Sequence, residues 1–307
     1  MIARLYERLL GGLAAPTRGI VMMASATIVV SVMHVMIREL SAELHAFEIA
    51  FFRNLVTLCF MLPMIFSSGP DTWRTKHPKL HIARGLIGAA AVLTWFQSLA
   101  LTPVATATAL SFAAPIFITI AAAIVLKEPV GPRRWTAVGL GFLGAMIILR
   151  PGMIALDPGA ILVLVSTVFW AASLTIVKLV SRDDSSVTIV FYAALFATPI
   201  SLIAAWPVWE WPDGWQFTRL MIIGTLATVA HLCMTQAFRE ADASVVTPID
   251  FGRLIVTTIL GWYIFSELPD FWTIIGAVVI FGSTAFITWR ESRIARPKIG
   301  SGGPPPV

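Results

Sequence analysis

Two oppositely charged side chains stand close together in one of the most apolar stretches of the chain. Asp250 and Arg253 are three positions apart within residues 243–265, which hold no other charged residue. In a helix this spacing places both side chains on one side, where they can neutralise each other. An unpaired charge there would cost about 2.5 to 3.5 kcal/mol on membrane-insertion scales. Two interpretations are open: a structural ion pair, or a pair that contacts a charged substrate.

Further polar and aromatic side chains in the apolar runs are candidates for lining a binding site. They are Trp95, Gln97, Trp170, Tyr192, Gln236 and Tyr263. Aromatic faces mixed with amide donors are typical of cavities that bind planar or zwitterionic metabolites. For the Trp and Tyr residues the alternative is anchoring at the membrane interface, a role that we assign to Trp206, Trp209, Trp211 and Trp215.

Ionisable side chains also occur in other apolar runs. The first run carries a polar stripe at helical spacing: Thr27, Ser31, His34 and Arg38. Such a stripe cannot face lipid, so it either lines a cavity or hydrogen-bonds a neighbouring helix. Glu48 and Arg53 in the second run point in different directions, so each is expected to have its own partner on another helix. For Arg53, packing or gating competes with substrate contact, and for His231 a simple interhelical hydrogen bond is the alternative to titration.

The segments that hold these residues are long enough to cross a bilayer. The 307 residues are 57% hydrophobic and 13% charged, whereas an average soluble domain is about 25% charged. Ten apolar runs cover most of the chain: 17–37, 46–66, 80–100, 103–126, 133–149, 157–178, 187–208, 217–237, 243–265 and 271–289. A barrel strand needs only about 10 residues, and in lipid a helix satisfies its own backbone hydrogen bonds. We therefore expect an all-α membrane protein with ten transmembrane helices.

The distribution of Lys and Arg predicts the orientation of these helices. With the N-terminus inside, sixteen of these residues fall on the inner side and three, Arg38, Arg150 and Arg219, fall on the outer side. By the positive-inside rule both termini are expected in the cytoplasm. The net charge of +5 then reflects topology, and no nucleic-acid partner is needed to explain it.

The second half of the chain repeats the first. Gln97 and Glu128 are 31 residues apart, as are Gln236 and Glu267, which gives an offset of 139. An odd number of helices per half predicts that the second copy is inverted in the membrane, with substrate near the midplane between halves that rock. The alternative is chance matching among apolar segments. The offset aligns Asp250 with Ser111, so the charged pair exists in one copy only, and Ser111 joins the candidate site.

Several motifs, in their order, resemble the EamA-type carriers of the drug/metabolite transporter superfamily. In the first half they are residues 105–112 (ATATALSF), Pro115, Glu128, Arg133-Arg134-Trp135, the glycines of 139–144 and residues 149–152 (LRPG). In the second half they are residues 247–251 (TPIDF), Arg253-Leu254, Gly261-Trp262, residues 265–270 (FSELPD) and Gly276. The likeness covers roughly residues 17–290. It implies a 5+5 inverted-topology repeat, with a first repeat at 17–152 and a second at 153–290. We expect a cytoplasmic N-terminal segment at 1–16 and a disordered cytoplasmic tail at 291–307.

The resemblance implies a multi-pass carrier of small metabolites in a bacterial-type inner membrane. We expect secondary-active or facilitative transport, by alternating access, of a charged or zwitterionic metabolite. An amino-acid derivative or a nucleoside-like compound such as S-adenosylmethionine fits this description; the alternative is an exporter of drugs or metal-chelating metabolites. Protons or an exchanged solute are the expected energy sources. His34, Glu48, Arg53 and His231 are the candidates for gating or coupling, and His34 titrates near neutral pH.

The sequence lacks the motifs of two other classes of membrane protein, hydrolases and nucleotide-driven pumps. No GxSxG or HExxH motif of a hydrolase and no GxxxxGK loop of a nucleotide-driven pump is present. We therefore expect no enzyme activity, no catalytic residue, no bound metal and no cofactor. Cys59 and Cys233 lie inside apolar runs and are expected to be inert packing residues rather than a disulfide.

Overall fold

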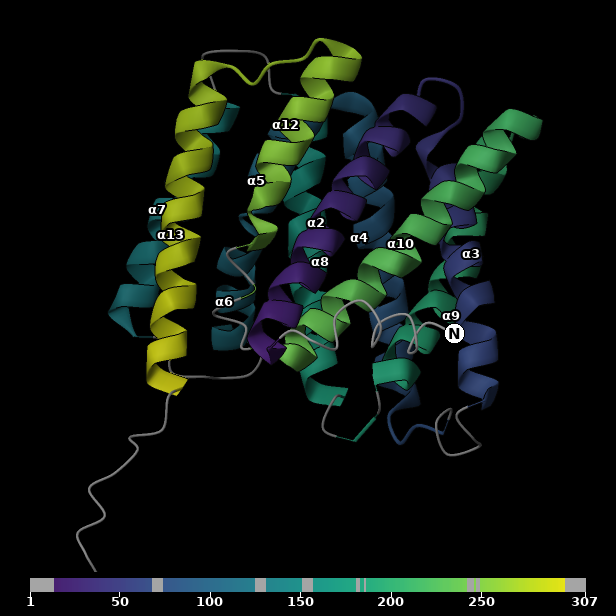
Figure 1. Cartoon of the computed structure of the whole chain (residues 1–307), viewed down its shortest axis with the longest axis horizontal. Helices are drawn as coiled ribbons and strands as arrows, with labels where there is room; N and C mark the ends of the chain where they lie inside the picture. The colour runs from purple at the N-terminus through teal and green to yellow at the C-terminus, as the bar shows by residue number, and fades with distance from the viewer. Residues whose placement is uncertain are drawn as a thin grey trace, which may run out of the picture.

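The chain folds into a bundle of α-helices (Figure 1). The structure, a computed structural model, describes residues 14–67, 74–124, 131–150, 157–180, 183–184, 186–241, 246 and 249–295, and these ranges contain no β-strand. The helices are α2 (Ala15–Leu40), α3 (Ala46–Ser67), α4 (Pro78–Leu101), α5 (Val104–Ser111), α6 (Ala114–Ile124), α7 (Pro132–Leu149), α8 (Pro158–Val180), α9 (Ser186–Ala205), the short 3-10 helix η2 (Trp206–Val208), α10 (Gly214–Glu240), α12 (Gly252–Phe265) and α13 (Phe271–Ala295). Seven segments are long and apolar enough to cross a membrane, and three shorter apolar helices accompany them. The predicted all-α membrane architecture is confirmed.

The two ends of the described chain differ slightly from the prediction. α2 begins at Ala15, so residues 15–16 belong to a helix rather than to the N-terminal segment. α13 continues to Ala295, so residues 291–295, which we assigned to a disordered tail, are helical. The segment after Arg290 is rich in Arg and Glu, which favour helix, so it can prolong a helix beyond the apolar run. Residues 1–13 and 296–307 lie outside the described residues, as does the boundary at 152 and 153.

The fourth apolar run is not one continuous helix. It breaks at Phe112 and Ala113, between α5 and α6, just before Pro115. Pro115 has no N–H to donate to the carbonyl oxygen of Ser111, so it interrupts a continuous helix but is tolerated in the first turn of the next one, where it lies here. The ninth run turns at Phe251, immediately before α12; its proline, Pro248, lies outside the described residues. The rings of Phe112 and Phe251 pack edge to face with their centroids 4.9 Å apart, so the two breaks meet.

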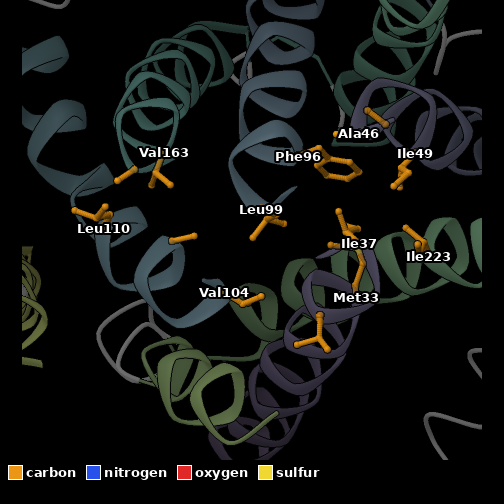
Figure 2. Close-up of a cluster of buried hydrophobic side chains, with 14 of the residues drawn as sticks. Met33, Ile37, Ala46, Ile49, Phe96, Leu99, Val104, Leu110, Val163 and Ile223 are labelled. Carbon is orange, nitrogen blue, oxygen red and sulfur yellow. The ribbon is translucent and has the colours of Figure 1, made fainter. Parts of the chain in front are cut away.

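The bundle has two distinct ends. The start of α2 and the end of α13 lie at the lower end in Figure 1, which we call the terminal end. The opposite, distal end is where α2, α4 and α12 finish and where α3 and α10 begin. The largest buried apolar cluster includes Ile37, Ile49, Leu99, Val104 and Ile223, whose side chains are drawn in Figure 2. Ile37 and Leu99 lie in the last turns of α2 and α4, and Ile49 lies in the first turn of α3, so this part of the cluster is near the distal end. In lipid such a cluster is held by van der Waals packing, and it closes the bundle at this end.

Small residues let two helices of the bundle approach closely. A Cβ added to Gly276 of α13 would lie 2.6 Å from the carbonyl oxygen of Gly144 in α7, and one on Gly144 would lie 2.9 Å from the carbonyl oxygen of Gly276. The two backbones are therefore in direct contact, as small residues permit in membrane bundles. This contact joins the last helix of the first half to the last helix of the second.

Gly276→Ala is expected to lower the free energy of unfolding by about 1 to 3 kcal/mol, because the added methyl group meets a backbone carbonyl that cannot move aside. Thermal unfolding of the detergent-purified protein would measure this change. Gly139→Ala on α7 is the matched control, since its Cβ would meet nothing within 4 Å. Alanine there removes a helix penalty of about 0.5 to 1 kcal/mol, so the control should be unchanged or more stable. Equal stability of the two variants would contradict the close packing.

Candidate functional site

Asp250 and Arg253 lie within ion-pair distance at the break before α12. Nη2 of Arg253 is 3.5 Å from Oδ2 of Asp250, and the guanidinium carbon lies 5.2 Å from the ring centroid of Phe112. Arg253 is therefore held between an acid of its own segment and an aromatic ring at the α5–α6 break. Its Nε is buried and has no hydrogen-bond partner. We call Asp250, Arg253, Phe112 and the neighbouring His34 and Trp95 the central cluster.

The His34–Trp95 contact determines how the histidine is protonated. Nε1 of Trp95 donates a hydrogen bond of 3.2 Å to Nε2 of His34, and the two rings meet edge to face. Because the indole N–H can only donate, Nε2 of His34 must accept, and a neutral ring carries its proton on Nδ1. That Nδ1 is buried without a hydrogen-bond partner. His34 can take up a second proton only if its contact with Trp95 rearranges.

A cavity of about 90 Å³ lies among α3, α4, α8, α9 and α10. Its polar or aromatic lining residues are Arg53, Asn54, Thr57, Arg84, Trp170, Ser173 and His231. Both Arg53 of the cavity and Arg253 of the central cluster are close enough to act electrostatically on His34. We call this cavity the basic cavity. Of the residues proposed from the sequence, it brings together Arg53, Trp170 and His231.

Arg84 lines the cavity but was not among the site residues that we proposed from the sequence. It lies inside the apolar run 80–100 without a neighbouring acid in the sequence, and that isolation is the signal that could have found it. Asn54, Thr57 and Ser173 gave no such signal, because short polar residues are common in membrane helices. Nδ2 of Asn54 donates to Oγ of Ser201 on α9 at 2.8 Å, which connects α3 to α9 beside the cavity.

Several predicted site residues lie away from the basic cavity. Oγ of Ser111 donates to the carbonyl oxygen of Thr108 in its own helix at 2.7 Å. Oε1 of Gln97 is buried without a hydrogen-bond partner. Tyr263 is 82% exposed on α12 and does not face the central cluster. The aromatic side chain that does border the cavity is Trp170.

Gln236 and Tyr192 belong to contacts towards the terminal end. Nε2 of Gln236 donates to Glu240 at 2.8 Å, and Glu240 forms an ion pair of 2.8 Å with Arg18. The ring of Tyr192 packs on that of His81, with centroids 4.8 Å apart. Both residues therefore take part in helix contacts at the terminal end rather than lining the cavity.

His81 in turn ties α4 to the turn between α8 and α9. Its Nε2 lies 2.8 Å from Oδ2 of Asp184, which also accepts a hydrogen bond of 2.6 Å from Thr75. Burial alone would raise the pKa of Asp184, but the hydrogen bonds from Thr75 and His81 outweigh it and hold that pKa below its usual value. Asp184 is therefore charged at neutral pH, and the tie is a charge-assisted one.

Ion pairs at the distal end connect the two halves of the chain. They join the three arginines that the charge pattern places outside to acids of the other half: Arg38 with Glu267 at 3.0 Å, Arg150 with Asp270 at 2.6 Å and Arg219 with Glu43 at 3.0 Å. Burial would raise the pKa of Asp270, but hydrogen bonds from Thr273 and the charge of Arg150 lower it overall.

Glu48 also takes part in closing the distal end. Its Oε1 accepts a hydrogen bond of 2.7 Å from the backbone N–H of Glu210, in the segment between η2 and α10. Beside it, Trp209 packs against Phe51 and Phe52 of α3 at centroid distances of 5.6 and 5.8 Å. This segment therefore lies over the first turns of α3. We call the ion pairs of Arg38, Arg150 and Arg219, together with the Glu48 contact, the distal ties.

Comparison with known proteins identifies the family. The model of the EamA-like transporter family matches the chain twice, at residues 17–150 and 157–289. The chain belongs to the EamA-like transporter family. A crystal structure of a protein with 16% sequence identity has a TM-score of 0.62 and covers 91% of this chain and 99% of its own, which shows that the fold is shared.

Curated relatives of this EamA-like chain are transporters of different small molecules. It is 32% identical over 259 residues to an S-adenosylmethionine uptake transporter of Rickettsia felis, covering 84% of this chain and 88% of the relative. It is 31% identical over 286 residues to a riboflavin transporter of Vibrio cholerae, covering 92% and 96%. A pseudopaline exporter of Pseudomonas aeruginosa is 28% identical over 264 residues, covering 85% and 93%.

Proposed function

We propose that this EamA-like protein carries a small charged or zwitterionic metabolite across a bacterial inner membrane by alternating access. The observation that carries the proposal is the presence of two charged sites inside the apolar bundle: the basic cavity and the Asp250–Arg253 pair. Ionisable groups at this depth are costly, and in membrane proteins they mark substrate or ion pathways. Asp250 and Arg253 are proposed to bind complementary charges on the substrate.

The names of the relatives favour a nucleoside-like or heteroaromatic substrate. S-adenosylmethionine and riboflavin both carry a planar ring system with polar groups attached, and Trp170 offers an aromatic face at the basic cavity. The second candidate is export of a metal-chelating metabolite, which the similarity to a pseudopaline exporter favours. Both functions are transport, and we propose no enzymatic activity.

We further propose that the two halves form a 5+5 inverted-topology repeat. The two family matches, at 17–150 and 157–289, support this proposal. So do the helix breaks at Phe112 and Phe251, whose positions differ by the offset of 139 found in the sequence. In such proteins broken helices border the substrate site, and the halves rock around it.

Alternating access would require the distal ties to open, because each of them joins one half to the other. In the described structure the buried apolar cluster and these ties close the distal end. A cavity of about 90 Å³ is also smaller than the 300 to 1,000 Å³ of typical ligand pockets. A whole metabolite would therefore need the helices around the basic cavity to move apart.

Purified protein in liposomes is expected to take up labelled S-adenosylmethionine or riboflavin in a saturable manner, with empty liposomes as the control. Proton coupling through His34 or Glu48 predicts that accumulation falls when the pH gradient is collapsed. If accumulation is unchanged, protons do not drive transport, and exchange or facilitated diffusion remains as the mechanism. Turnover of a lipid or peptide without solute flux would contradict a carrier.

Replacing both members of the central ion pair, in Asp250→Asn/Arg253→Gln, is expected to leave a folded protein that has lost about tenfold or more in substrate affinity. A hydrogen bond to a charged group contributes about 1.5 to 3 kcal/mol, whereas removing a buried pair together avoids an unpaired charge. Concentration-dependent uptake into liposomes would measure the loss. The matched control is His77→Gln/Asp183→Asn, which removes an exposed pair of 2.8 Å at the terminal end. A fully active double variant would show that the central pair is only structural.

Both termini are expected in the cytoplasm and the segment before α10 outside. In a protein with Cys59 and Cys233 replaced, Gly214→Cys should react with a membrane-impermeant thiol reagent on intact cells, while Lys76→Cys should react only after lysis. Gly214 suits the test because an added Cβ meets nothing within 4 Å, and Lys76 is exposed. The opposite labelling pattern would overturn the orientation.

A further inference from the structure

The two arginines of the basic cavity have no acidic partner among the described residues, unlike five other arginines of the described bundle. The arginines with acids within 4 Å form the pairs Arg18–Glu240, Arg38–Glu267, Arg150–Asp270, Arg219–Glu43 and Arg253–Asp250. Arg53 and Arg84 form no such pair with any described residue, and the cavity lining contains no Asp or Glu. The positive charge of the cavity is therefore not balanced by the residues around it.

The hydrogen bonds of these two arginines leave donors unused. Nη1 of Arg53 donates to Oδ1 of Asn54 at 2.8 Å, and Nη1 of Arg84 donates to the carbonyl oxygen of Ile189 at 2.6 Å. Nε of each is buried without a hydrogen-bond partner. Each guanidinium thus has Nη1 anchored to the helix bundle, while its other terminal nitrogen, Nη2, makes no hydrogen bond to a described residue and keeps its donors.

A bound anion would balance this charge. An unpaired arginine near the middle of the membrane costs about 2.5 to 3.5 kcal/mol on insertion scales, and two in one cavity also repel each other. A planar carboxylate matches the fork of a guanidinium group and forms strong charge-assisted hydrogen bonds with it. Both arginines line one cavity of about 90 Å³, so a carboxylate bound there would experience the charge of both.

We propose that Arg53 and Arg84 form a subsite for a carboxylate group of the transported substrate. The proposal rests on the proposed function and narrows its substrate class to metabolites that carry a carboxylate. Ser173 offers a hydroxyl group in the same cavity, and Trp170 also lines it, whereas the Thr57 hydroxyl already donates to the carbonyl oxygen of Arg53 at 2.9 Å. Gly88 also lines the cavity, opposite Ser173: a Cβ added to it would lie in ordinary contact with Oγ of Ser173, at 3.7 Å.

Compounds that differ only in the carboxylate test the subsite on the wild-type protein. The probes are S-adenosylmethionine against its decarboxylated form, and L-methionine against L-methioninamide. Binding to the full chain in detergent is measured by thermal shift and tryptophan fluorescence, and uptake of the same probes is measured in liposomes. We expect the carboxylate member of a pair to bind at least about tenfold more tightly, which corresponds to about 1.4 kcal/mol.

Neutral variants assign the preference to the two arginines. Arg53→Gln and Arg84→Gln should each weaken binding of the carboxylate member and leave the other member nearly unchanged, so that the preference falls below about threefold. Arg84→Lys keeps the charge but loses the guanidinium fork, and should keep an intermediate preference. Lys79→Gln is the matched control, because it removes one positive charge from an exposed position of the same helix. It should retain the full preference.

The outcomes separate this subsite from the transport proposal. If the wild-type protein binds both members of a pair equally, or if both neutral arginine variants keep the preference, the carboxylate subsite is wrong. Uptake of those probes into liposomes would then leave the transport function standing. If neither the probes with a carboxylate nor those without one are bound or taken up, both the proposed substrate class and the subsite are wrong. Loss of folding in Arg84→Gln would not protect the proposal, because the wild-type comparison and Arg53→Gln decide it independently.

Discussion

The cost of an unpaired charge in lipid is the constraint on which the rest of this structure depends. Water cannot solvate a bare guanidinium or carboxylate at the centre of a bilayer, so each must find a partner, a hydrated cavity or a ligand. At the two ends of the bundle, arginines meet acids from the other half of the chain, and these contacts hold the halves together. In the basic cavity, by contrast, Arg53 and Arg84 form no ion pair with any described residue. Structural charges and candidate functional charges are thereby distinguished by their neighbours.

The same constraint applies to the backbone. A helix break inside a membrane protein exposes N–H and C=O groups and is tolerated only where protein or a cavity covers it. Here the breaks at Phe112 and Phe251 lie against each other inside the bundle, and Arg253 lies over the ring of Phe112. The irregular backbone and the central charges therefore occupy one region, where a carrier can bind a polar substrate without exposing it to lipid.

If the protein works by alternating access, as we propose, the structure with its distal ties formed and its small basic cavity represents one of its conformations. A contact that must break and re-form is easier to build from ion pairs than from continuous apolar packing. When an ion pair at the membrane surface opens, each charged group regains water. The Gly144–Gly276 contact between α7 and α13 cannot be replaced by contacts with water, because two packed backbones that separate inside the bilayer gain no solvation. Motion is therefore easier at the distal ties than between these two helices.

The amino-acid sequence by itself determined the number and approximate limits of the apolar helices, the asymmetry of their flanking charges and the family. These properties come from local transfer free energies and motif order, which need no knowledge of packing. It also indicated the Asp250–Arg253 pair, because that contact lies within a single segment. Tertiary structure alone decided that Arg84 lies beside Arg53 and His231, that Trp95 binds His34, and that Tyr263 is turned away. Helices that are apolar on every side carry no pattern that says which face meets a neighbour, so contacts between them depend on packing that no single segment encodes.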